Sequence, residues 1–413
     1  MKILHIAYSC IPGQFRGGVS KVVYDLGRAQ ALLGHEVSIY TTNYNSSVRV
    51  GVPLDIPIVS DGVKIHYFKI DNARWVTSST LRHYLITSAP FYDVLHSHNI
   101  FLALNFYACQ AHKHSGRPLF YHVHGSLDPL VLKRGFFKCI KKRAYLWLIE
   151  KRNYECSTGL FALSISEAEQ IRRQGITKPI HLATNGIWSE EYATVKTESV
   201  LREQWGLRDS QPIVLFIGRI VPKKGVHLLV NAFADLHHSH PDAVLMIGGD
   251  RGQDTGYVRL IDRLVADHGL NRSVIWTGFL SENEKRSALG AATIFSHVSE
   301  SEGMAMSVLE AMAAGLPVIV SKACYMSDAV GADAVIECGF SAQALAATLN
   351  KLLTSDQRRQ DLGVKAQQYV RSNHSWLSIA KSVVATYQTA RPTIGPCYNK
   401  IAQNLRSGET RLD

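Results

Sequence analysis

The sequence predicts an α/β protein made of two doubly wound, Rossmann-like domains. Two observations lead to this prediction: short β-branched strands alternate with amphipathic helices, and the alternation starts again near the middle of the 413-residue chain. Strands joined by helices lie parallel, with right-handed crossovers and helices on both faces of the sheet. Ligands of such folds bind at the carboxyl ends of the strands.

The first half opens with a strand at 3–8 and a loop that contains several glycines. A helix follows at 19–33, because apolar residues recur there at helical spacing, and a second strand is expected at 37–41. The remaining strands expected in this half span 63–68, 94–98, 119–124 and 160–164.

The second half repeats the pattern, beginning with a strand at 212–217. Its further strands are expected at 243–247, 274–277, 292–297 and 317–321, and its helices at 227–236, 258–268 and 306–314. The polar, charged segment 187–211 marks the boundary between the halves. We therefore expect domains at 1–190 and 191–373, with a polar tail at 391–413.

The composition narrows the class of protein. A hydrophobic fraction of 46% and a charged fraction of 19% exclude a mainly disordered chain. The net charge of +11 favours anionic partners: nucleic acid, phosphorylated substrates or an acidic membrane surface. None of the seven cysteines forms a Cys-x-x-Cys pair, which disfavours a disulfide framework or a zinc ribbon and favours a reducing compartment.

The N-terminal segment predicts a buried strand and lacks the long apolar stretch of a signal peptide. No apolar stretch approaches the ~18 residues of a transmembrane helix. A cytoplasmic protein is therefore expected.

Two glutamates flank the start of the helix at 306–314. Glu302 and Glu310 have seven residues between them, and Gly303 allows a ligand to approach the backbone closely. If the stretch were wholly helical, the carboxylates would lie about 12 Å apart along the axis, a span that fits a ligand with a sugar at one end and a ribose at the other. Backbone N–H groups near Ala305 would face an anion. The alternative is an ordinary amphipathic helix with solvated glutamates.

Two cations follow the strand at 212–217. Gly218 ends this strand, and Arg219 and Lys224 lie in the loop before the next helix. Cations at the carboxyl end of a strand can neutralise a diphosphate leaving group. The alternative is a solvated basic loop, which is the expectation for Lys223.

A pair of glycines, Gly17 and Gly18, opens the helix at 19–33, in a position that can approach phosphate or sugar. The Gly-x-Gly-x-x-Gly fingerprint is absent, and no acidic residue closes the second strand, which disfavours a dinucleotide-dependent dehydrogenase. The Walker pattern is absent as well.

Histidines end two of the strands. His124 ends the strand at 119–124 and is expected to face the crevice and contact a ligand, whereas His122 is expected to be a core histidine. A His pair without a third ligand at suitable spacing does not predict a zinc site. The sequence leaves the roles of His96 and His98 open.

The stretch 131–152 mixes cations with aromatic residues. Its members are Lys133, Arg134, Lys138, Lys141, Lys142 and Arg143 among the cations, and Phe136, Phe137, Tyr145 and Trp147 among the aromatics. Such a segment suits an anionic membrane face or an acidic, lipid-linked acceptor. The alternative is a surface helix whose aromatic residues belong to the core.

Taken together, these motifs resemble those of the retaining glycosyltransferases of family 4, which have the GT-B fold. The resemblance covers nearly the whole chain, and it implies that 374–390 forms a helix that crosses back to the first domain. It also implies that Glu302 binds the donor sugar and Glu310 the ribose of the nucleotide. Arg219 and Lys224 resemble the residues that bind the diphosphate.

The resemblance assigns further contacts near the sugar donor. His124 resembles a histidine that contacts the sugar near the reaction centre, and the backbone of 277–279 resembles the loop that meets the nucleobase. The full set of implied contacts adds Gly17, Gly18, Asn185, Gly218, Thr277, Gly278, Phe279, Gly303, Met304 and Ala305.

Three departures from the family pattern bear on specificity. Met304 and Ala305 replace Phe-Gly, and the added Cβ at Ala305 alters the space for the sugar. The Asp of an Asn-Gly-Val-Asp motif is replaced by Trp188. His124-Gly125 replaces a frequent His-Asp pair, and this variant resembles members that build bacterial surface polysaccharides.

The resemblance therefore implies transfer of a hexose from a nucleotide diphosphate sugar to a hydroxyl of a lipid-linked glycan, with no metal, no other cofactor and no nucleic acid. Peripheral contact with the inner face of the plasma membrane is part of this expectation. Three alternatives stay open. A nucleotide-sugar epimerase would form product without an acceptor, a nucleic-acid-binding protein would show steeply salt-dependent binding, and a catalytically idle scaffold would only bind partners.

Overall fold

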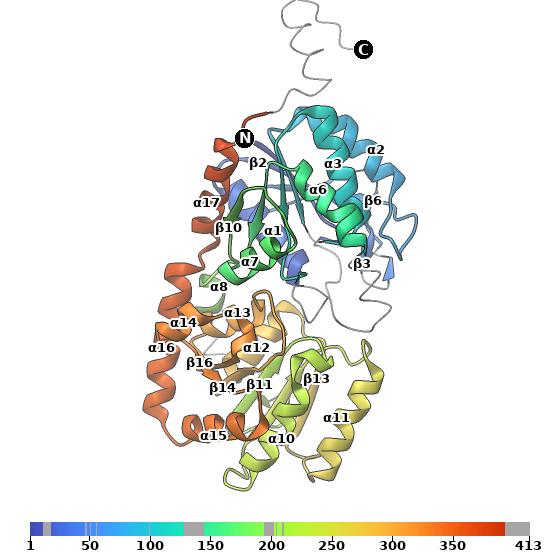
Figure 1. Cartoon of the computed structure of the whole chain (residues 1–413). Coiled ribbons are helices and arrows are strands. Elements are labelled where there is room, and N and C mark those ends of the chain that lie inside the picture. The colour runs from blue at the N-terminus through green and yellow to red at the C-terminus, as the bar shows by residue number, and fades with distance from the viewer. Residues whose placement is uncertain are drawn as a thin grey trace, which may run out of the picture. The chain divides into compact units, whose positions relative to one another are not determined.

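The computed structural model divides the chain into two compact units (Figure 1). Unit 1 comprises Met1–Gly186 and the segment that begins at Trp376, and unit 2 comprises Ile187–Ser375. The structure describes residues 1–10, 18–45, 48–49, 51–54, 56–98, 100–127, 144–193, 202–203, 205–208 and 210–392. Gly17, most of the basic stretch 131–152 and the expected tail lie outside these residues.

Unit 1 is built on an eight-stranded sheet in the order β10-β9-β8-β7-β1-β2-β6-β5. Its parallel strands are β1 (Lys2–Ile6), β2 (Glu36–Thr42), β6 (Val63–Phe68), β7 (Val94–His98), β8 (Leu119–His122), β9 (Gly159–Ala162) and β10 (Ile180–Leu182). The strand β5 (Ile58–Ser60) pairs with β6 in the antiparallel direction at one edge, and β3 (Tyr44–Asn45) and β4 (Val48–Arg49) form a separate short hairpin.

The helices of unit 1 cover both faces of this sheet. They are α1 (Gly18–Leu32), α2 (Ser79–Ser88), α3 (Ala103–Ser115), α6 (Lys151–Cys156), α7 (Ile165–Arg173) and α17 (Trp376–Thr389), with a 3-10 turn at Ala89–Phe91 and a π-helical turn at Leu146–Glu150. The helices α2, α3 and α6 pack in succession, and α17 packs against α1. The residues of the inner strands β1, β2, β7, β8 and β9 are almost all buried, as expected for parallel strands that are covered on both faces.

Unit 2 has a six-stranded, wholly parallel sheet in the order β13-β12-β11-β14-β15-β16. The strands are β11 (Ile213–Ile217), β12 (Val244–Gly248), β13 (Val274–Gly278), β14 (Ile294–His297), β15 (Val318–Ser321) and β16 (Ile336–Cys338). The order runs outward from β11 in one direction and then restarts on its other side at β14. This is the strand order of the Rossmann fold.

The helices of unit 2 are α8 (Glu190–Ala193), α10 (Val226–His237), α11 (Thr255–Asp267), α12 (Glu282–Ala291), α13 (Met306–Ala313), α14 (Ser327–Gly331), α15 (Ala342–Leu353) and α16 (Asp356–Asn373). Short 3-10 turns occur at Pro222–Lys224 and Lys322–Cys324. The helix α10 packs against both α11 and α15, and their apolar faces supply much of the core. The strands predicted for this half are confirmed to within two residues.

The chain passes from unit 1 to unit 2 beside a glycine that the packing requires. A Cβ on Gly186 would lie 2.4 Å from Cδ2 of Trp376, so a larger residue would displace the indole. The next residue, Ile187, donates a backbone hydrogen bond of 2.7 Å to the carbonyl of His374. The start of α17 is thus anchored where the chain changes units.

Candidate active site

In unit 2 the predicted sugar-donor residues gather at the point where the strand order reverses. The chain leaves β11 toward β12 and leaves β14 toward β15, on the other side of the sheet order, and in folds of this kind ligands bind at the carboxyl ends of the strands at such a reversal. The loop after β11 carries Gly218, Arg219 and Lys224, and the loop after β14 carries Glu302. Two motifs that lie far apart in the sequence are therefore neighbours in space.

Lys224 and Glu302 form a direct, buried ion pair. The ammonium of Lys224 donates a short hydrogen bond to Oε1 of Glu302, and Oγ of Ser299 donates another of 2.8 Å to the same oxygen. Burial alone would raise the pKa of Glu302. The charge of Lys224, together with the hydrogen bonds from Lys224 and His297, outweighs this effect and holds the pKa of Glu302 well below its usual range, so the carboxylate is ionised.

His297 is a third member of this cluster, and the sequence analysis missed it. It is the last residue of β14, is buried, and donates from Nε2 to Oε1 of Glu302 over 3.0 Å. Burial is the main reason why its pKa is lowered, and Lys224 adds to the effect. A polar residue at the carboxyl end of a predicted strand was the available signal.

Gly225 explains why the loop after β11 can approach β14. It has a φ of +66°, and a Cβ at this position would lie 2.1 Å from the carbonyl oxygen of Val298. The glycine therefore allows Lys224 to reach Glu302. Gly249 has a similar role that the sequence analysis also missed, because its Cβ would lie 2.0 Å from the carbonyl oxygen of Gly218.

The helix α13 begins at Met306, so Glu302 precedes it and only Glu310 lies within it. The expected spacing of about 12 Å assumed a continuous helix and does not apply. Glu310 is buried and accepts a hydrogen bond of 2.6 Å from Lys285 on α12, a partner that the sequence analysis did not identify. The two glutamates therefore occupy separate sites with separate cations.

The start of α13 leaves backbone donors open to an anion. Its N-cap is Ala305, whose side chain cannot accept a hydrogen bond from the first turn. Gly303 and Met304, both half-buried, lead into this turn, and Ala305 itself is buried. Helix N-termini with unfilled N–H groups favour phosphate oxygens.

The remaining unit 2 residues of the prediction lie at the carboxyl ends of neighbouring strands. Arg219 is exposed, and among the described residues its guanidinium has no recorded partner. Thr277 and Gly278 end β13, with Gly278 at a φ of +72°, and Phe279 follows as an exposed ring. The loops after β11, β13 and β14 therefore lie at the same end of the sheet.

In unit 1 the structure corrects the position of His124. The strand β8 ends at His122, so His124 lies in the following turn with a φ of +55°. Its Nε2 and Nδ1 of His98 share a hydrogen bond of 3.0 Å, and its ring stacks on that of His122. Burial lowers the pKa of His124 to about 3, so the imidazole is neutral.

Two further residues of the predicted contact set lie in unit 1. Gly18 begins α1, and Asn185 is buried just before Gly186.

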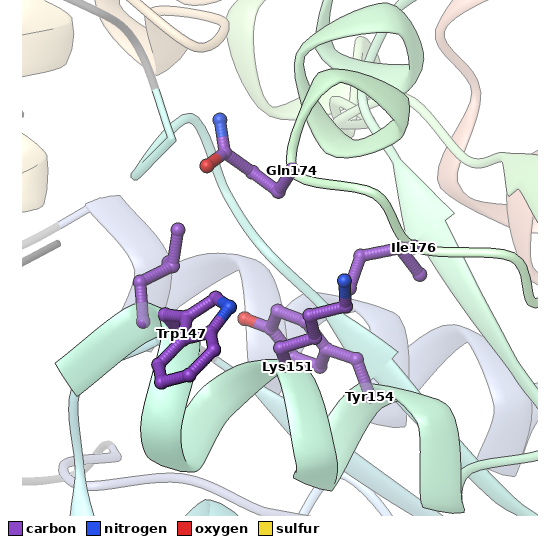
Figure 2. Close-up of a pocket in the computed structure, with 6 residues that line it drawn as sticks. Trp147, Lys151, Tyr154, Gln174 and Ile176 are labelled. Atoms are coloured by element: carbon purple, nitrogen blue, oxygen red, sulfur yellow. The ribbon is translucent and has the colours of Figure 1, made fainter. Parts of the chain in front are cut away.

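Unit 1 also contains a pocket of about 300 Å³ that none of the predicted sugar-donor residues lines (Figure 2). It is formed by Leu146, Trp147, Lys151, Tyr154, Gln174 and Ile176. Trp147 is 69% exposed, and Leu148 and Ile149 beside it are exposed as well. The described end of the stretch 131–152 therefore presents apolar surface, not only charge.

Comparisons with known proteins match each half of the chain to a glycosyltransferase family. Residues 17–186 match the model of the glycosyl transferase 4-like domain, and residues 198–369 match that of glycosyl transferases group 1. Among the described residues, no helix has the length and apolar character needed to cross a membrane.

Individual relatives agree with these matches. The D-inositol 3-phosphate glycosyltransferase of Corynebacterium urealyticum is 29% identical over 52% of this chain and 53% of its own length. The protein of the same name from Frankia alni is 25% identical over 91% of this chain and 95% of its own. The structure of Anabaena HepE in complex with UDP and glucose has a TM-score of 0.75, with 18% identity over 94% of this chain and 100% of that chain.

The chain spans about half the length of several of the curated relatives that it matches, although the Frankia relative is matched over almost all of its length. Both halves nevertheless match glycosyltransferase models, and both sheets have the Rossmann-like order expected of the GT-B fold. The chain thus belongs to the GT4-type glycosyltransferases.

Proposed function

We propose that this protein transfers a hexose, with retention at the anomeric carbon, from a nucleoside diphosphate sugar to a hydroxyl of a lipid-linked glycan. The acceptor would belong to bacterial surface polysaccharide biosynthesis. One observation carries the proposal: Lys224, Glu302 and His297 meet at the strand-order reversal of unit 2. A paired cation and carboxylate suit a ligand that joins a diphosphate to a sugar.

In this proposal the protein acts by positioning and by charge. The bond between the anomeric carbon and the diphosphate breaks, and a new bond to the acceptor oxygen forms on the same face. The acceptor's proton passes to an oxygen of the departing diphosphate, so no side chain acts as the nucleophile. Arg219, Lys224 and the N-terminus of α13 stabilise the developing negative charge.

The Lys224–Glu302 pair would be rearranged when the sugar donor binds. A diphosphate competes with the carboxylate for the ammonium, which frees an oxygen of Glu302 to accept a hydrogen bond from a sugar hydroxyl. His297 keeps the carboxylate in place during this exchange. The proposal includes independence from metal ions, so turnover persists in excess EDTA, and rescue of a lost activity by Mg²⁺ contradicts that part.

A thermal-shift panel tests the proposal. Uridine and guanosine diphosphate sugars are compared with the free diphosphates and with a nucleic acid duplex, because a ligand that binds the folded state raises its stability in proportion to RT ln(1 + [L]/Kd). Stabilisation by at least one nucleotide sugar, followed by transfer to a glycan acceptor, supports it. Product without an acceptor favours the epimerase, and stabilisation by the duplex alone contradicts the proposal.

We further propose peripheral contact with an anionic membrane at the inner face of the plasma membrane. The exposed Trp147, Leu148 and Ile149 follow the last cation of 131–143 after three intervening residues. Aromatic and aliphatic side chains beside a polybasic segment are typical of interfacial binding. Such contact would hold the enzyme near a lipid-linked acceptor.

A further inference from the structure

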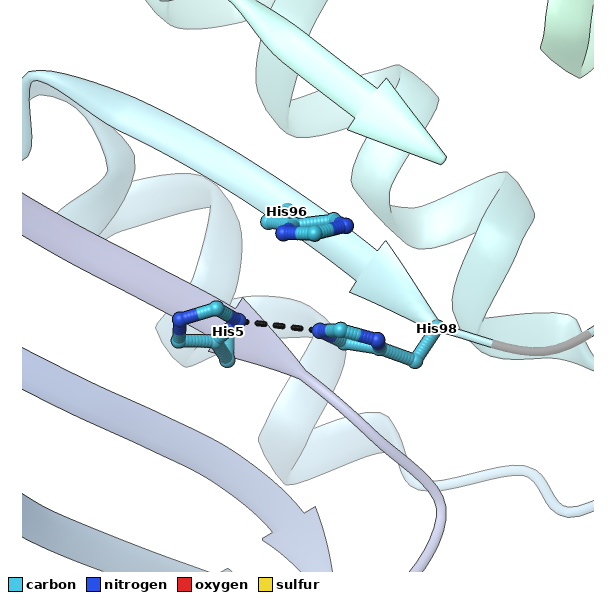
Figure 3. A group of neighbouring side chains, drawn as sticks. All are labelled: His5, His96 and His98. Carbon is cyan, nitrogen blue, oxygen red and sulfur yellow. Dashed lines mark hydrogen bonds between the residues drawn. The ribbon is translucent and has the colours of Figure 1, made fainter. Parts of the chain in front are cut away.

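Five histidines of unit 1 lie on one face of its sheet. His5 comes from β1, His96 and His98 from β7, and His122 and His124 from the end of β8 and the turn after it. The rings of His96 and His98 lie on the same side because side chains alternate along a strand. The ring of His124 lies in the turn after β8 and stacks on that of His122. Figure 3 shows His5, His96 and His98, which β1 and β7 bring together as neighbouring parallel strands.

Three of these rings bring ring nitrogen atoms close together. One ring nitrogen from each of His5, His96 and His98 lies within 4.8 Å of the other two, and all three side chains are fully buried. Nδ1 of His5 and Nε2 of His98 are 2.9 Å apart. The rings of His96 and His98 are stacked, with centroids 4.2 Å apart and an interplanar angle of 29°. The ring of His96 therefore has to turn before its lone pair can point to an ion that the other two rings share.

The second nitrogen of each ring is held by a partner outside the group. Nε2 of His5 lies 2.7 Å from Oε1 of Gln30, and Nδ1 of His96 lies 2.5 Å from the hydroxyl of Tyr387. Nδ1 of His98 lies 3.0 Å from Nε2 of His124. Histidine ligands of metals are oriented by this kind of hydrogen bond to the non-ligating nitrogen.

These outer contacts leave lone pairs inside the group. The carbonyl oxygen of Gln30 only accepts, so Nε2 of His5 carries the hydrogen and Nδ1 holds a lone pair. Nε2 of His96 is buried and has no hydrogen-bond partner among the described residues. An unpartnered buried nitrogen calls for an explanation, and a bound ion provides one.

We propose that His5, His96 and His98 bind one divalent late transition metal ion, with Zn²⁺ as the representative. Imidazole ligands favour such ions over Mg²⁺ or Ca²⁺. When the ion binds, the proton on Nε2 of His98 moves to Nδ1 of the same ring, and the proton on Nε2 of His124 moves to its own Nδ1, so that His98 then donates to His124 and both rings stay neutral. The site belongs to unit 1 and would act structurally, because it joins β1 to β7 and, through Gln30 and Tyr387, reaches α1 and α17. It does not depend on the proposed transfer reaction.

A second group, His98, His122 and His124, also has nitrogens within 4.8 Å of one another. Neither nitrogen of His122 has a hydrogen-bond partner among the described residues, so nothing orients that ring as a ligand. His124 is only partly buried, whereas all three rings of the first group are fully buried. The first group is therefore the better site.

Because the site is buried, metal uptake is measured during refolding. The full chain is unfolded in guanidinium with EDTA, exchanged into buffer and refolded with Co²⁺, whose visible absorption reports the coordination. We expect one tightly held Co²⁺ per chain that Zn²⁺ displaces. The variants His5→Gln and His96→Gln should lose it, and His112→Gln, a buried histidine outside the group, should keep it.

A variant outside the ligand set covers the case in which a ligand variant fails to fold. Gln30→Met leaves the three rings in place but removes the acceptor of His5, and it should weaken Co²⁺ binding about 10- to 100-fold. Absence of stoichiometric Co²⁺ after refolding overturns the proposal. So does binding that survives His96→Gln, or binding that is lost in His122→Gln alone.

Discussion

Nζ of Lys285 donates a hydrogen bond of 2.6 Å to Oε1 of Glu310, and both side chains are buried between α12 and α13. Burial alone would lower the pKa of Lys285, but the carboxylates of Glu310 and Glu282 raise it above its ordinary value. The pair fixes one oxygen of Glu310 and leaves Oε2 for a second partner. A ribose hydroxyl is the partner that the family resemblance implies.

Replacing Lys285 with Met should destabilise the protein by about 3 kcal/mol, because Glu310 would remain buried without its cation. Urea unfolding measures this loss. The double variant Lys285→Met/Glu310→Met should recover much of it. Arg286→Met is the control, since Arg286 pairs with Glu191 at a half-exposed position and should cost far less. Equal losses for Lys285→Met and Arg286→Met would contradict the assigned importance of the buried pair.

Substitutions of the three cations in the loop after β11 should have different effects on activity and stability. Arg219→Ala and Lys224→Ala should each lower kcat/KM at least ~10²-fold, roughly 2.7 kcal/mol of transition-state stabilisation. Arg219 is exposed, so its variant should keep wild-type stability, whereas Lys224→Ala also leaves Glu302 buried and unpaired. Lys223→Ala, in the same turn, should stay close to wild type. Near-normal turnover in both of the first two variants rules out their diphosphate role.

Membrane contact should depend on both apolar and basic groups. Trp147→Ser, and separately reversal of the charges at Lys138, Lys141, Lys142 and Arg143, should release the protein from anionic vesicles in a flotation assay. Each basic group near such a surface contributes about 1 kcal/mol. Nucleotide-sugar affinity should not change. If the wild-type protein does not bind vesicles at physiological salt, the stretch is a plain surface segment.

Much of the fold could be predicted from the sequence because parallel strands are buried on both faces and read as short apolar runs. The strands at 63–68 and 94–98 appear as predicted. The two-residue error at His124 arose because Val123 continues the apolar pattern although the backbone has already turned. The edge strand β5 has only three residues, too few for a periodic signal.

The candidate site could be predicted only in part. Motif positions identified Lys224, Glu302 and Glu310, since each follows a strand or lies on a recognisable helix. Their buried partners, His297 and Lys285, depend on contacts between segments that are far apart in the sequence. Hydrophobic periodicity carries no information on such pairings. Only the three-dimensional structure brings them together.

Stability should fall with rising pH because of Glu150. This buried carboxyl accepts a hydrogen bond of 2.7 Å from the backbone of Phe101 and others from Asn105, yet burial raises its pKa to about 7. Below pH 4.5 it is protonated in both the folded and the unfolded state. Between pH 4.5 and 7 only the unfolded state ionises, so the free energy of unfolding falls by on the order of 2–3 kcal/mol and then levels off.

Urea unfolding of the wild type and of Glu150→Gln at pH 5 and pH 8 measures this contribution. The wild type should lose more stability between the two pH values than the variant. The exposed Glu169→Gln should behave as the wild type does. A pH dependence that is the same in all three proteins would show that Glu150 ionises freely in the folded state.

Substitutions of Glu302 and Glu310 should weaken the binding of different ligands if Glu302 holds the sugar and Glu310 holds the ribose. Glu310→Ala should weaken the free nucleoside diphosphate and the whole sugar donor alike, by about 1.5–3 kcal/mol, the usual range for a hydrogen bond to a charged group. Glu302→Ala should weaken only the whole sugar donor and slow transfer. Because Lys224 pairs with Glu302 in the free protein, this variant also releases the ammonium. The free diphosphate should therefore bind Glu302→Ala at least as tightly as it binds the wild type.

Calorimetric titration of each variant with nucleotide and with nucleotide sugar measures these differences, and the exposed Glu300→Ala in the same loop is the control. Equal losses for both ligands in both variants would mean that the two carboxylates only hold their loops in place.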